Sequence, residues 1–262
     1  METNTKTISN GVQNSKMHDN AAKLVFGDPT LCAQFLKSYT DIPLFKDIKP
    51  EDIEDISSQF LPLFQESRDS DVVKKIRISD SEMYLIALIE HQSQNDFDMS
   101  FRLLRYMVFI WTNYANAQEK LHPNITKSKD FLYPPILPII YYEGSGEWTA
   151  ALNFKDRVFL SDIFEEYILD FKYQVVPLAN FSQQDLVEKG DELSAIFILN
   201  KLKDSSDFQS LKNLPAEYWE QLAQNTPQHT LNLIGKIFSA FLHKLNIPSE
   251  EINELTDHIS LI

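Results

Sequence analysis

Two extended segments separated by a short polar loop constrain the fold more than any other feature of this sequence. Residues 71–78 read DVVKKIRI and residues 83–90 read MYLIALIE, and both are rich in Val, Ile and Leu. Residues 79–82 (SDSE) between them are of types common in turns. The pattern predicts a β-hairpin with a four-residue loop, so the chain must build a sheet around it.

The flanking segments predict an α/β domain with a helical C-terminal part. Residues 99–117 (MSFRLLRYMVFIWTNYANA) have the strongest helical pattern in the chain. Further strands are predicted in 134–144 and 173–181, and Pro138 inside the first of these predicts an edge strand or a bulge. The remaining predicted helices are 19–38, broken before Pro29, then 49–66, 183–203, 215–224 and 227–245.

The composition is that of a chain able to bury a core without disulfides or metal staples. Of its 262 residues 43% are hydrophobic, and no apolar run approaches the roughly 18–20 residues that span a bilayer. The N-terminal stretch METNTKTISNGVQNSK is polar and lacks a signal-peptide core. The single cysteine, Cys32, excludes an internal disulfide and fits a reducing cytoplasm. We therefore expect a cytoplasmic protein with no membrane partner.

The net charge of −14 weighs against nucleic-acid binding, which depends on neutralising phosphates. The acidity is unevenly spread, however. Residues 65–130 hold 9 Lys/Arg against 10 Asp/Glu, whereas residues 131–262 hold 9 against 19. The region of the hairpin is thus nearly neutral, and DNA stays open as a partner.

A carboxylate, Glu90, ends the second, otherwise apolar strand of the hairpin. If Ile78 faces Met83 across the loop, Asp71 lies opposite Glu90, with Cβ atoms roughly 4.5–5.5 Å apart. Two carboxylates at that separation need a proton or a cation between them. A hard divalent cation such as Mg²⁺ or Mn²⁺ would satisfy both. A register shifted by two residues would keep both side chains on one face but separate them diagonally.

The residues after Glu90 extend this hypothesis. Gln92 projects from the same face and could orient a water molecule or contact a phosphate oxygen. His91 points the other way, but its backbone carbonyl could complete a metal shell. A metal held in this way would support phosphodiester hydrolysis. The alternative is structural: Glu90 simply ends a strand, Asp71 caps a turn, and Gln92 is solvated.

Other chemically suggestive residues have simpler interpretations. The histidines lack a second ligand at zinc spacing, and the glycines of residues 144–146 lack the context of a phosphate loop, so they predict a turn. Tyr141, Tyr142 and Trp148 could stack on a base, although packing in the core or at its rim is the alternative.

Several stretches resemble the Rpn family of recombination-promoting nucleases, also grouped as transposase_31 and placed in the PD-(D/E)XK nuclease superfamily. The main one is ALIEHQSQNDFDMSFRLLRYMVFIW, preceded by SDVVKKI. The others are HDNAAKLVFGDPTLCAQFLK, PPILPIIYYEGSGEW and DIFEEYILDFKYQVVPL. Together they run from about His18 to about Lys203. The resemblance implies a restriction-endonuclease-like α/β core with a mixed central sheet flanked by helices.

With this resemblance, the domain organisation becomes a disordered tail (1–17), a PD-(D/E)XK nuclease-like domain (18–205) and a helical C-terminal extension packed on the same domain (206–262). Asp71 matches the metal-binding Asp of the second core strand, and Glu90 matches the Glu of the third. Gln92 takes the place of the motif's lysine. Glu-x-Gln is usual in the family, so the missing lysine does not mark this chain as inactive.

The resemblance leaves open which group supplies the positive charge that Gln92 lacks. Arg102 and Arg105, three residues apart on one helix, could supply it and contact DNA, or could pair with neighbouring carboxylates. Asp19 matches an acidic position of the first helix, or it caps that helix.

The resemblance thus implies a Mg²⁺-dependent DNA endonuclease, with Mn²⁺ as an alternative metal, that acts in recombination or in mobile elements. A homodimer would suit cleavage of both strands. The alternative function is a non-catalytic descendant of the nuclease fold that binds a protein partner, and the net charge of −14 favours it.

Overall fold

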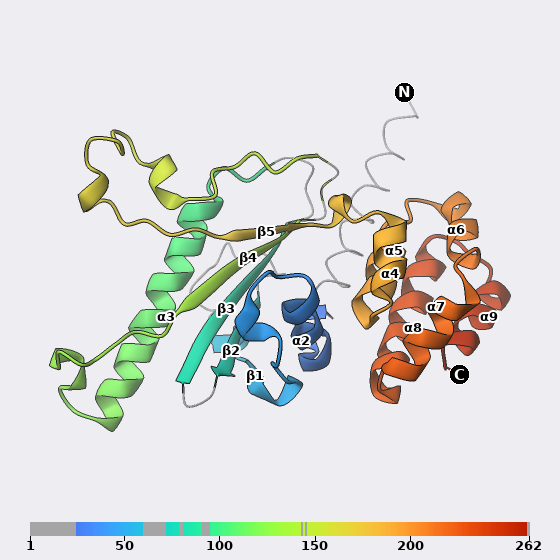
Figure 1. Cartoon of the computed structure of the whole chain (residues 1–262), viewed down its shortest axis with the longest axis horizontal. Helices are drawn as coiled ribbons and strands as arrows, with labels where there is room; N and C mark the ends of the chain where they lie inside the picture. The colour runs from blue at the N-terminus through green and yellow to red at the C-terminus, as the bar shows by residue number, and fades with distance from the viewer. Residues whose placement is uncertain are drawn as a thin grey trace. The chain divides into compact units, whose positions relative to one another are not determined.

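The chain divides into two compact units (Figure 1), of which the first comprises Met1–Pro50 with Leu178–Ile262 and the second Glu51–Pro177. This computed structural model describes residues 25–59, 72–78, 81–90, 95–142, 144 and 146–260, and only the backbone at 59, 88–90, 258 and 260. The predicted boundary at residue 205 lies inside the first unit, and the predicted domain 18–205 spans parts of both. That domain extent stays a prediction.

The second unit contains a five-stranded mixed sheet in the order β1-β2-β3-β4-β5. The first three strands are antiparallel, whereas β3, β4 and β5 run parallel. The strands are β1 (Ile53–Asp55), β2 (Val72–Ile78), β3 (Ser81–Glu90), β4 (Ile136–Tyr142) and β5 (Gln174–Pro177). This arrangement confirms the predicted α/β class, the mixed sheet and the four predicted strands.

The hairpin of β2 and β3 is confirmed, but its predicted register is wrong by two residues. Ile78 pairs with Ser81 and Ile76 pairs with Met83, so two residues rather than four connect the strands. Ser81 and Glu82 belong to the strand because Lys75 reaches Glu82 at 2.5 Å and holds its side chain against β2. The premise that set Asp71 opposite Glu90 therefore fails, whereas a two-residue shift preserves which face each side chain occupies.

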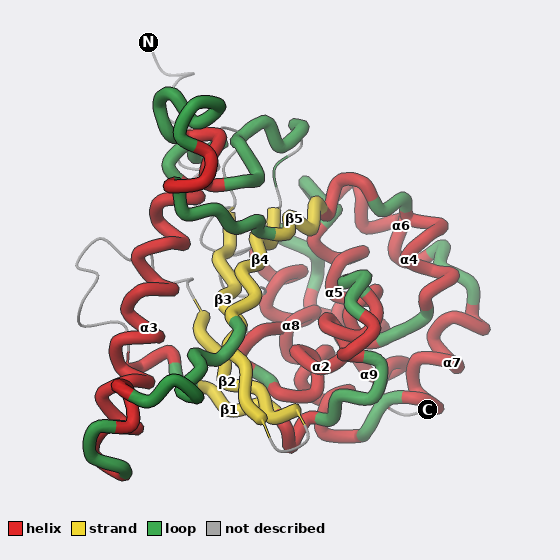
Figure 2. Tube along the Cα trace, turned by 60° about the vertical axis from the view of Figure 1, so that its left-hand side comes forward, coloured by secondary structure: helices red, strands yellow, loops and turns green. Residues whose placement is uncertain are grey.

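Helix α3 (Met99–Leu121) connects β3 to its parallel neighbour β4. Figures 1 and 2 show this helix lying along the sheet. Its buried residues recur at helical spacing and pack on side chains of β3 and β4 that include Ile86 and Ile140. The apolar ones are Met99, Leu103, Tyr106, Met107 and Ile110. The predicted helix 99–117 is thus confirmed and extends four residues further.

Two local predictions in this unit are wrong. Residues 50–59 form β1 between two short 3₁₀ helices rather than a helix, because Ile53 pairs with Ile76 of β2. Strand β4 lies inside the sheet, and its continuous register shows no bulge at Pro138. Because β5 pairs only with Ile139–Tyr142, Pro138 has a neighbouring strand on one side alone, and so the sheet accommodates it.

The described part of the first unit is helical. Its helices are α2 (Pro29–Ser38), α4 (Gln183–Lys189), α5 (Glu192–Asn200), α6 (Phe208–Lys212), α7 (Ala216–Asn225), α8 (Gln228–Lys244) and α9 (Ser249–Ser260). The predicted helix 183–203 is two helices, because Gly190 adopts a left-handed conformation (φ 57°) and ends α4. Asp191 then caps α5 and accepts a hydrogen bond of 3.1 Å from Tyr39, which follows α2.

Short 3₁₀ helices complete both units: η1 (Pro43–Phe45), η2 (Pro50–Asp52), η3 (Ser57–Gln59), η5 (Ile125–Lys127), η6 (Phe154–Arg157), η7 (Glu165–Tyr167), η8 (Leu178–Asn180) and η9 (Ser205–Asp207). Within the described ranges, no helix combines the length and the hydropathy needed to cross a bilayer.

A buried lysine of β2 forms an ion pair with the edge strand β1. Lys74 of β2 is fully buried, and its Nζ lies 2.9 Å from Oδ2 of the half-exposed Asp55. Burial alone would raise the pKa of Asp55, but hydrogen bonds from Ser57 and Lys74 outweigh it and lower the pKa overall. The folded state therefore favours the ionised carboxylate.

We predict that Asp55→Asn lowers the free energy of unfolding by about 2 kcal/mol at pH 7, because it leaves a buried ammonium without its anion. Since the folded pKa of Asp55 is lowered, its contribution is complete above the unfolded pKa of about 4 and is lost as pH falls through the folded value.

Urea denaturation at pH 7 and at about pH 3 measures this difference, and the gap between wild type and variant should shrink at the lower pH. Lys74→Met combined with Asp55→Asn should recover most of the loss. A gap that is the same at both pH values would show that the charge of Asp55 does not act through Lys74.

Candidate functional site

The parallel strands bring their carboxyl ends to one edge of the sheet. Glu90 is the last residue of β3 and pairs with Tyr142, the last residue of β4, which in turn pairs with Pro177 of β5. In open α/β sheets ligands bind outside the carboxyl ends of the strands. The backbone thus confirms that Glu90 stands at the end of a sheet strand, as the sequence predicted.

The structure does not describe the other predicted metal and catalytic residues. Asp19, Asp71, His91 and Gln92 lie outside the described residues, and the side chain of Glu90 is not described. Their roles stay predictions.

An aromatic cluster lines the sheet at this edge. The ring of Trp148 packs edge-on against Tyr142 at 5.2 Å and against Tyr173 at 6.2 Å between centroids. Its indole Nε1 donates a hydrogen bond of 3.1 Å to the Tyr173 hydroxyl. Burial raises the pKa of Tyr173. Since Tyr141 and Tyr142 are fully buried, the packing interpretation of these two tyrosines is the correct one.

The backbone at Gly144 lies so close to this aromatic cluster that no side chain fits there. A Cβ atom on Gly144 would collide with the ring and hydroxyl of Tyr142. The absence of a side chain at Gly144 therefore lets the backbone pass close to the Tyr142 ring, on which Trp148 also packs.

Asn95, which no sequence motif singled out, holds the segment around residues 147–149 in place. Its Nδ2 donates to the Glu147 carbonyl at 3.1 Å, and its Oδ1 accepts from the Thr149 backbone at 2.7 Å. An Asn just before the strongest helix of the chain was the available signal, since Asn side chains often bond to backbone groups in turns. The segments that follow β3 and β4 are thus joined at the strand ends.

The two arginines predicted to contact DNA lie on α3, near this edge. Arg102 forms an ion pair with Asp96, with a separation of 3.6 Å between Nη1 and Oδ2. Pairing with a neighbouring carboxylate was the structural alternative for this residue. Arg105 is exposed one turn further along α3. Contact of either residue with DNA stays a prediction.

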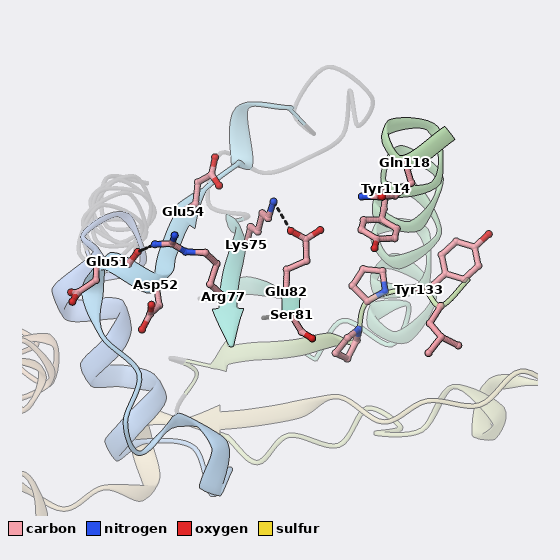
Figure 3. A pocket seen from close by; sticks show the side chains of 13 residues that line it. Glu51, Asp52, Glu54, Lys75, Arg77, Ser81, Glu82, Tyr114, Gln118 and Tyr133 are labelled. Atoms are coloured by element: carbon pink, nitrogen blue, oxygen red, sulfur yellow. Dashed lines mark hydrogen bonds and ion pairs between the residues drawn. The ribbon is translucent and has the colours of Figure 1, made fainter. Parts of the chain in front are cut away.

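A pocket of about 910 Å³ opens at the opposite end of the sheet (Figure 3). It is lined by the start of β3, the end of β2, residues 51–54, the C-terminal half of α3 and residues 132–135. Nine residue steps along β3 separate Ser81 from Glu90, which amounts to about 30 Å. The pocket is therefore a different place from the predicted nuclease site.

The charges of the pocket do not suit a phosphodiester. Four carboxylates line it, those of Glu51, Asp52, Glu54 and Glu82. Its two cations are engaged: Lys75 pairs with Glu82 at 2.5 Å, and Arg77 donates to the Glu51 carbonyl at 2.6 Å (Figure 3). Because the lining is net negative, phosphate groups would be repelled.

The described residues contain no cluster of the side chains that usually bind metals. No three His, Cys, Asp or Glu side chains in that part of the chain lie where they could share a metal ion. The predicted metal site includes Asp71 and His91, which lie outside the described residues, and it stays a prediction.

Comparison with known families gives a match over most of the chain. Residues 16–230 match the family model described as "Putative transposase, YhgA-like". No solved structure matches the chain.

Curated relatives from Escherichia coli agree with this match. The chain is 27% identical over 168 residues to "Inactive recombination-promoting nuclease-like protein RpnE" of strain K12, covering 62% of this chain and 52% of that protein. It is 28% identical to "Recombination-promoting nuclease RpnA" of strain K12 over 50% of this chain and 41% of the relative. It is 26% identical to "Recombination-promoting nuclease RpnD" of strain O157:H7 over 50% of this chain and 46% of the relative. The chain spans about half the length of these relatives.

We predict that Gly144→Ala destabilises the second unit by about 1–3 kcal/mol, because the added methyl group forces the Tyr142 ring out of its packed position. Gly27→Ala is the matched control, since a Cβ there meets no atom within 4 Å. Urea denaturation followed by tryptophan fluorescence compares the two. Equal stability of both variants would contradict the close approach.

Proposed function

Since the chain belongs to the family of YhgA-like transposases, we propose that it is a metal-dependent DNA endonuclease with a PD-(D/E)XK-type core that acts in recombination or in mobile-element biology. The observation that supports this most directly is the parallel register that ends β3 at Glu90 and β4 at Tyr142 on one edge of the sheet. The Glu-His-Gln motif thus begins at the strand ends, where α/β enzymes place their chemistry.

The donor set proposed for the metal is chemically consistent. Asp71 and Glu90 would supply carboxylate oxygens and His91 its backbone carbonyl oxygen, which are ligands that Mg²⁺ and Mn²⁺ prefer. A cation bound there would lower the pKa of its water and offset charge on the scissile phosphate. We propose Mg²⁺ as the cofactor on this chemical ground.

The remaining roles are assigned to side chains of the chain itself. Gln92 would orient the attacking water or contact a phosphate oxygen through its amide. Arg102 and Arg105 would bind the DNA backbone, and Arg102 would have to exchange its pairing with Asp96 for a phosphate. Asp19 would add a further carboxylate from the N-terminal region.

A second candidate is a non-catalytic descendant of the nuclease that binds a protein. Among the relatives compared above, the one matched over the largest share of this chain is named inactive. The net charge of −14, concentrated after residue 130, also favours a protein partner over DNA. The two candidates differ in whether Glu90 carries out chemistry.

We predict that purified protein cuts or nicks supercoiled plasmid in Mg²⁺ or Mn²⁺ and not in EDTA. Asp71→Asn and Glu90→Gln should each reduce cleavage at least about 100-fold, because the loss of either carboxylate removes a metal ligand whose action lowers the barrier by several kcal/mol. Gel analysis of the plasmid forms over time gives the rates.

Glu54→Gln is the matched control, since it removes an exposed carboxylate in the pocket at the other end of the sheet and should leave cleavage unchanged. Calorimetric titration with Mn²⁺ should detect one binding event that Glu90→Gln abolishes. Intact plasmid together with no bound Mn²⁺ in the wild type would refute the endonuclease and favour the protein-binding alternative.

A further inference from the structure

An ordered loop in the second unit exposes an unusual amount of apolar surface. We call residues 152–170, between β4 and β5, the apolar loop. Phe159, Ile163 and Tyr167 are 88%, 71% and 85% exposed, at a spacing of four residues. Four more large apolar residues of the loop are also exposed: Leu152, Leu160, Phe164 and Leu169.

The base of this loop is tightly closed. Asn153 and Lys172 form a β-bridge, and the rings of Phe154 and Phe171 stack at 5.8 Å with an interplanar angle of 12°. The Phe154 backbone N–H donates to the Phe171 carbonyl at 3.0 Å. Lys155 reaches Glu165 at 3.2 Å and Asp170 at 4.0 Å. The ends of the loop are therefore held together, as in compact functional loops.

The tip of the loop is also built from regular turns. The backbone N–H groups of Ile163 and Phe164 both donate to the Leu160 carbonyl, at 3.0 and 3.1 Å. Leu160 itself has a φ of 59°, a conformation that costs an apolar residue about 1 kcal/mol or more. A hydrogen-bonded backbone thus presents the apolar side chains to the outside.

Charge decides which class of partner could cover this surface. The loop carries two cations, Lys155 and Arg157, and five acids, Asp156, Asp162, Glu165, Glu166 and Asp170. Lys155 is already paired with acids of the loop. Because the loop is net acidic, the phosphates of DNA and an anionic membrane surface would both be repelled. The surface therefore fits a protein.

We propose that the apolar loop is the contact by which two copies of this chain form a dimer. The exposed fractions of its seven large apolar residues correspond to about 900 Å² per copy, close to the roughly 800 Å² that each partner buries in a stable interface. Large exposed patches of this kind are rare on monomers.

A twofold contact also suits the charges of the loop. In an isologous contact the same surface meets itself, so each apolar side chain faces apolar surface of the partner. Arg157 has no ion pair among the described residues of its own chain, and the second copy brings the acids Asp162 and Glu166 to the rim of the contact. Both signs of charge are thus available for pairing between copies.

The test measures mass in solution. At about 10 μM, light scattering coupled to gel filtration should give twice the mass of one chain for the wild type. Phe159→Asp and Tyr167→Asp should each give the mass of one chain, because a buried charge at the centre of the contact opposes association. Leu132→Asp is the matched control: Leu132 is 79% exposed but lies outside the loop, so the dimer should persist.

A crosslinking variant tests the twofold geometry separately. Ile163→Cys should form a disulfide between two chains on mild oxidation, whereas Leu132→Cys should not. Cys32 is buried and does not compete. Far-ultraviolet circular dichroism should show that all of these variants keep the fold of the wild type, since the substituted residues are exposed. A monomeric wild type, or a dimer that survives both Asp substitutions in the loop, would overturn the proposal whether or not the protein cuts DNA.

Discussion

The parallel pairing of β3 with β4 is the constraint on which the second unit depends. Parallel neighbours cannot be joined by a tight turn, so the chain must return to the starting edge of the sheet before β4 begins. The 23-residue helix α3 makes this return and buries one face on the strands that it connects. As a consequence, β3 and β4 end side by side at Glu90 and Tyr142. In the sequence, the proposed metal-binding residues lie at or next to the ends of strands β2 and β3.

The two ends of the sheet are chemically different, and this difference decides where a phosphodiester could bind. At the amino ends of β3 and β4 the pocket is lined by four carboxylates, and its two cations are already engaged. At the carboxyl ends Trp148 and Asn95 fix the turn after β4 against the sheet. Arg102 and Arg105 lie on α3 at that end. The phosphate contact that we propose therefore lies at the carboxyl ends, away from the acidic pocket.

The sequence predicted the elements of the sheet well but not their exact pairing. Segments rich in Val, Ile and Leu predicted β2 and β3 because the signal is local. The register failed because Ser81 and Glu82 are turn-type residues, yet a tertiary contact from Lys75 draws Glu82 into the strand. Likewise Ile53 and Ile56 fit a helical face, but pairing of Ile53 with β2 overrode the local preference. For the site, the pattern predicted that Glu90 ends a strand and missed Asn95, whose role depends on a turn more than fifty residues away.

The segment between β4 and β5 connects the candidate site to the proposed dimer contact. Residues 143–173 join two parallel strands without a long helix, although such crossovers normally use one. Loops of this length are uncommon in compact units and are usually either functional or linker segments. The near end of the segment packs Trp148 on Tyr142, and the far end presents Phe159 and Tyr167. Because Tyr173 hydrogen-bonds Trp148 where the chain returns, the aromatic cluster at the strand ends also supports the base of the apolar loop. Association of two copies through this loop would therefore act on the same aromatic cluster that borders the end of β3.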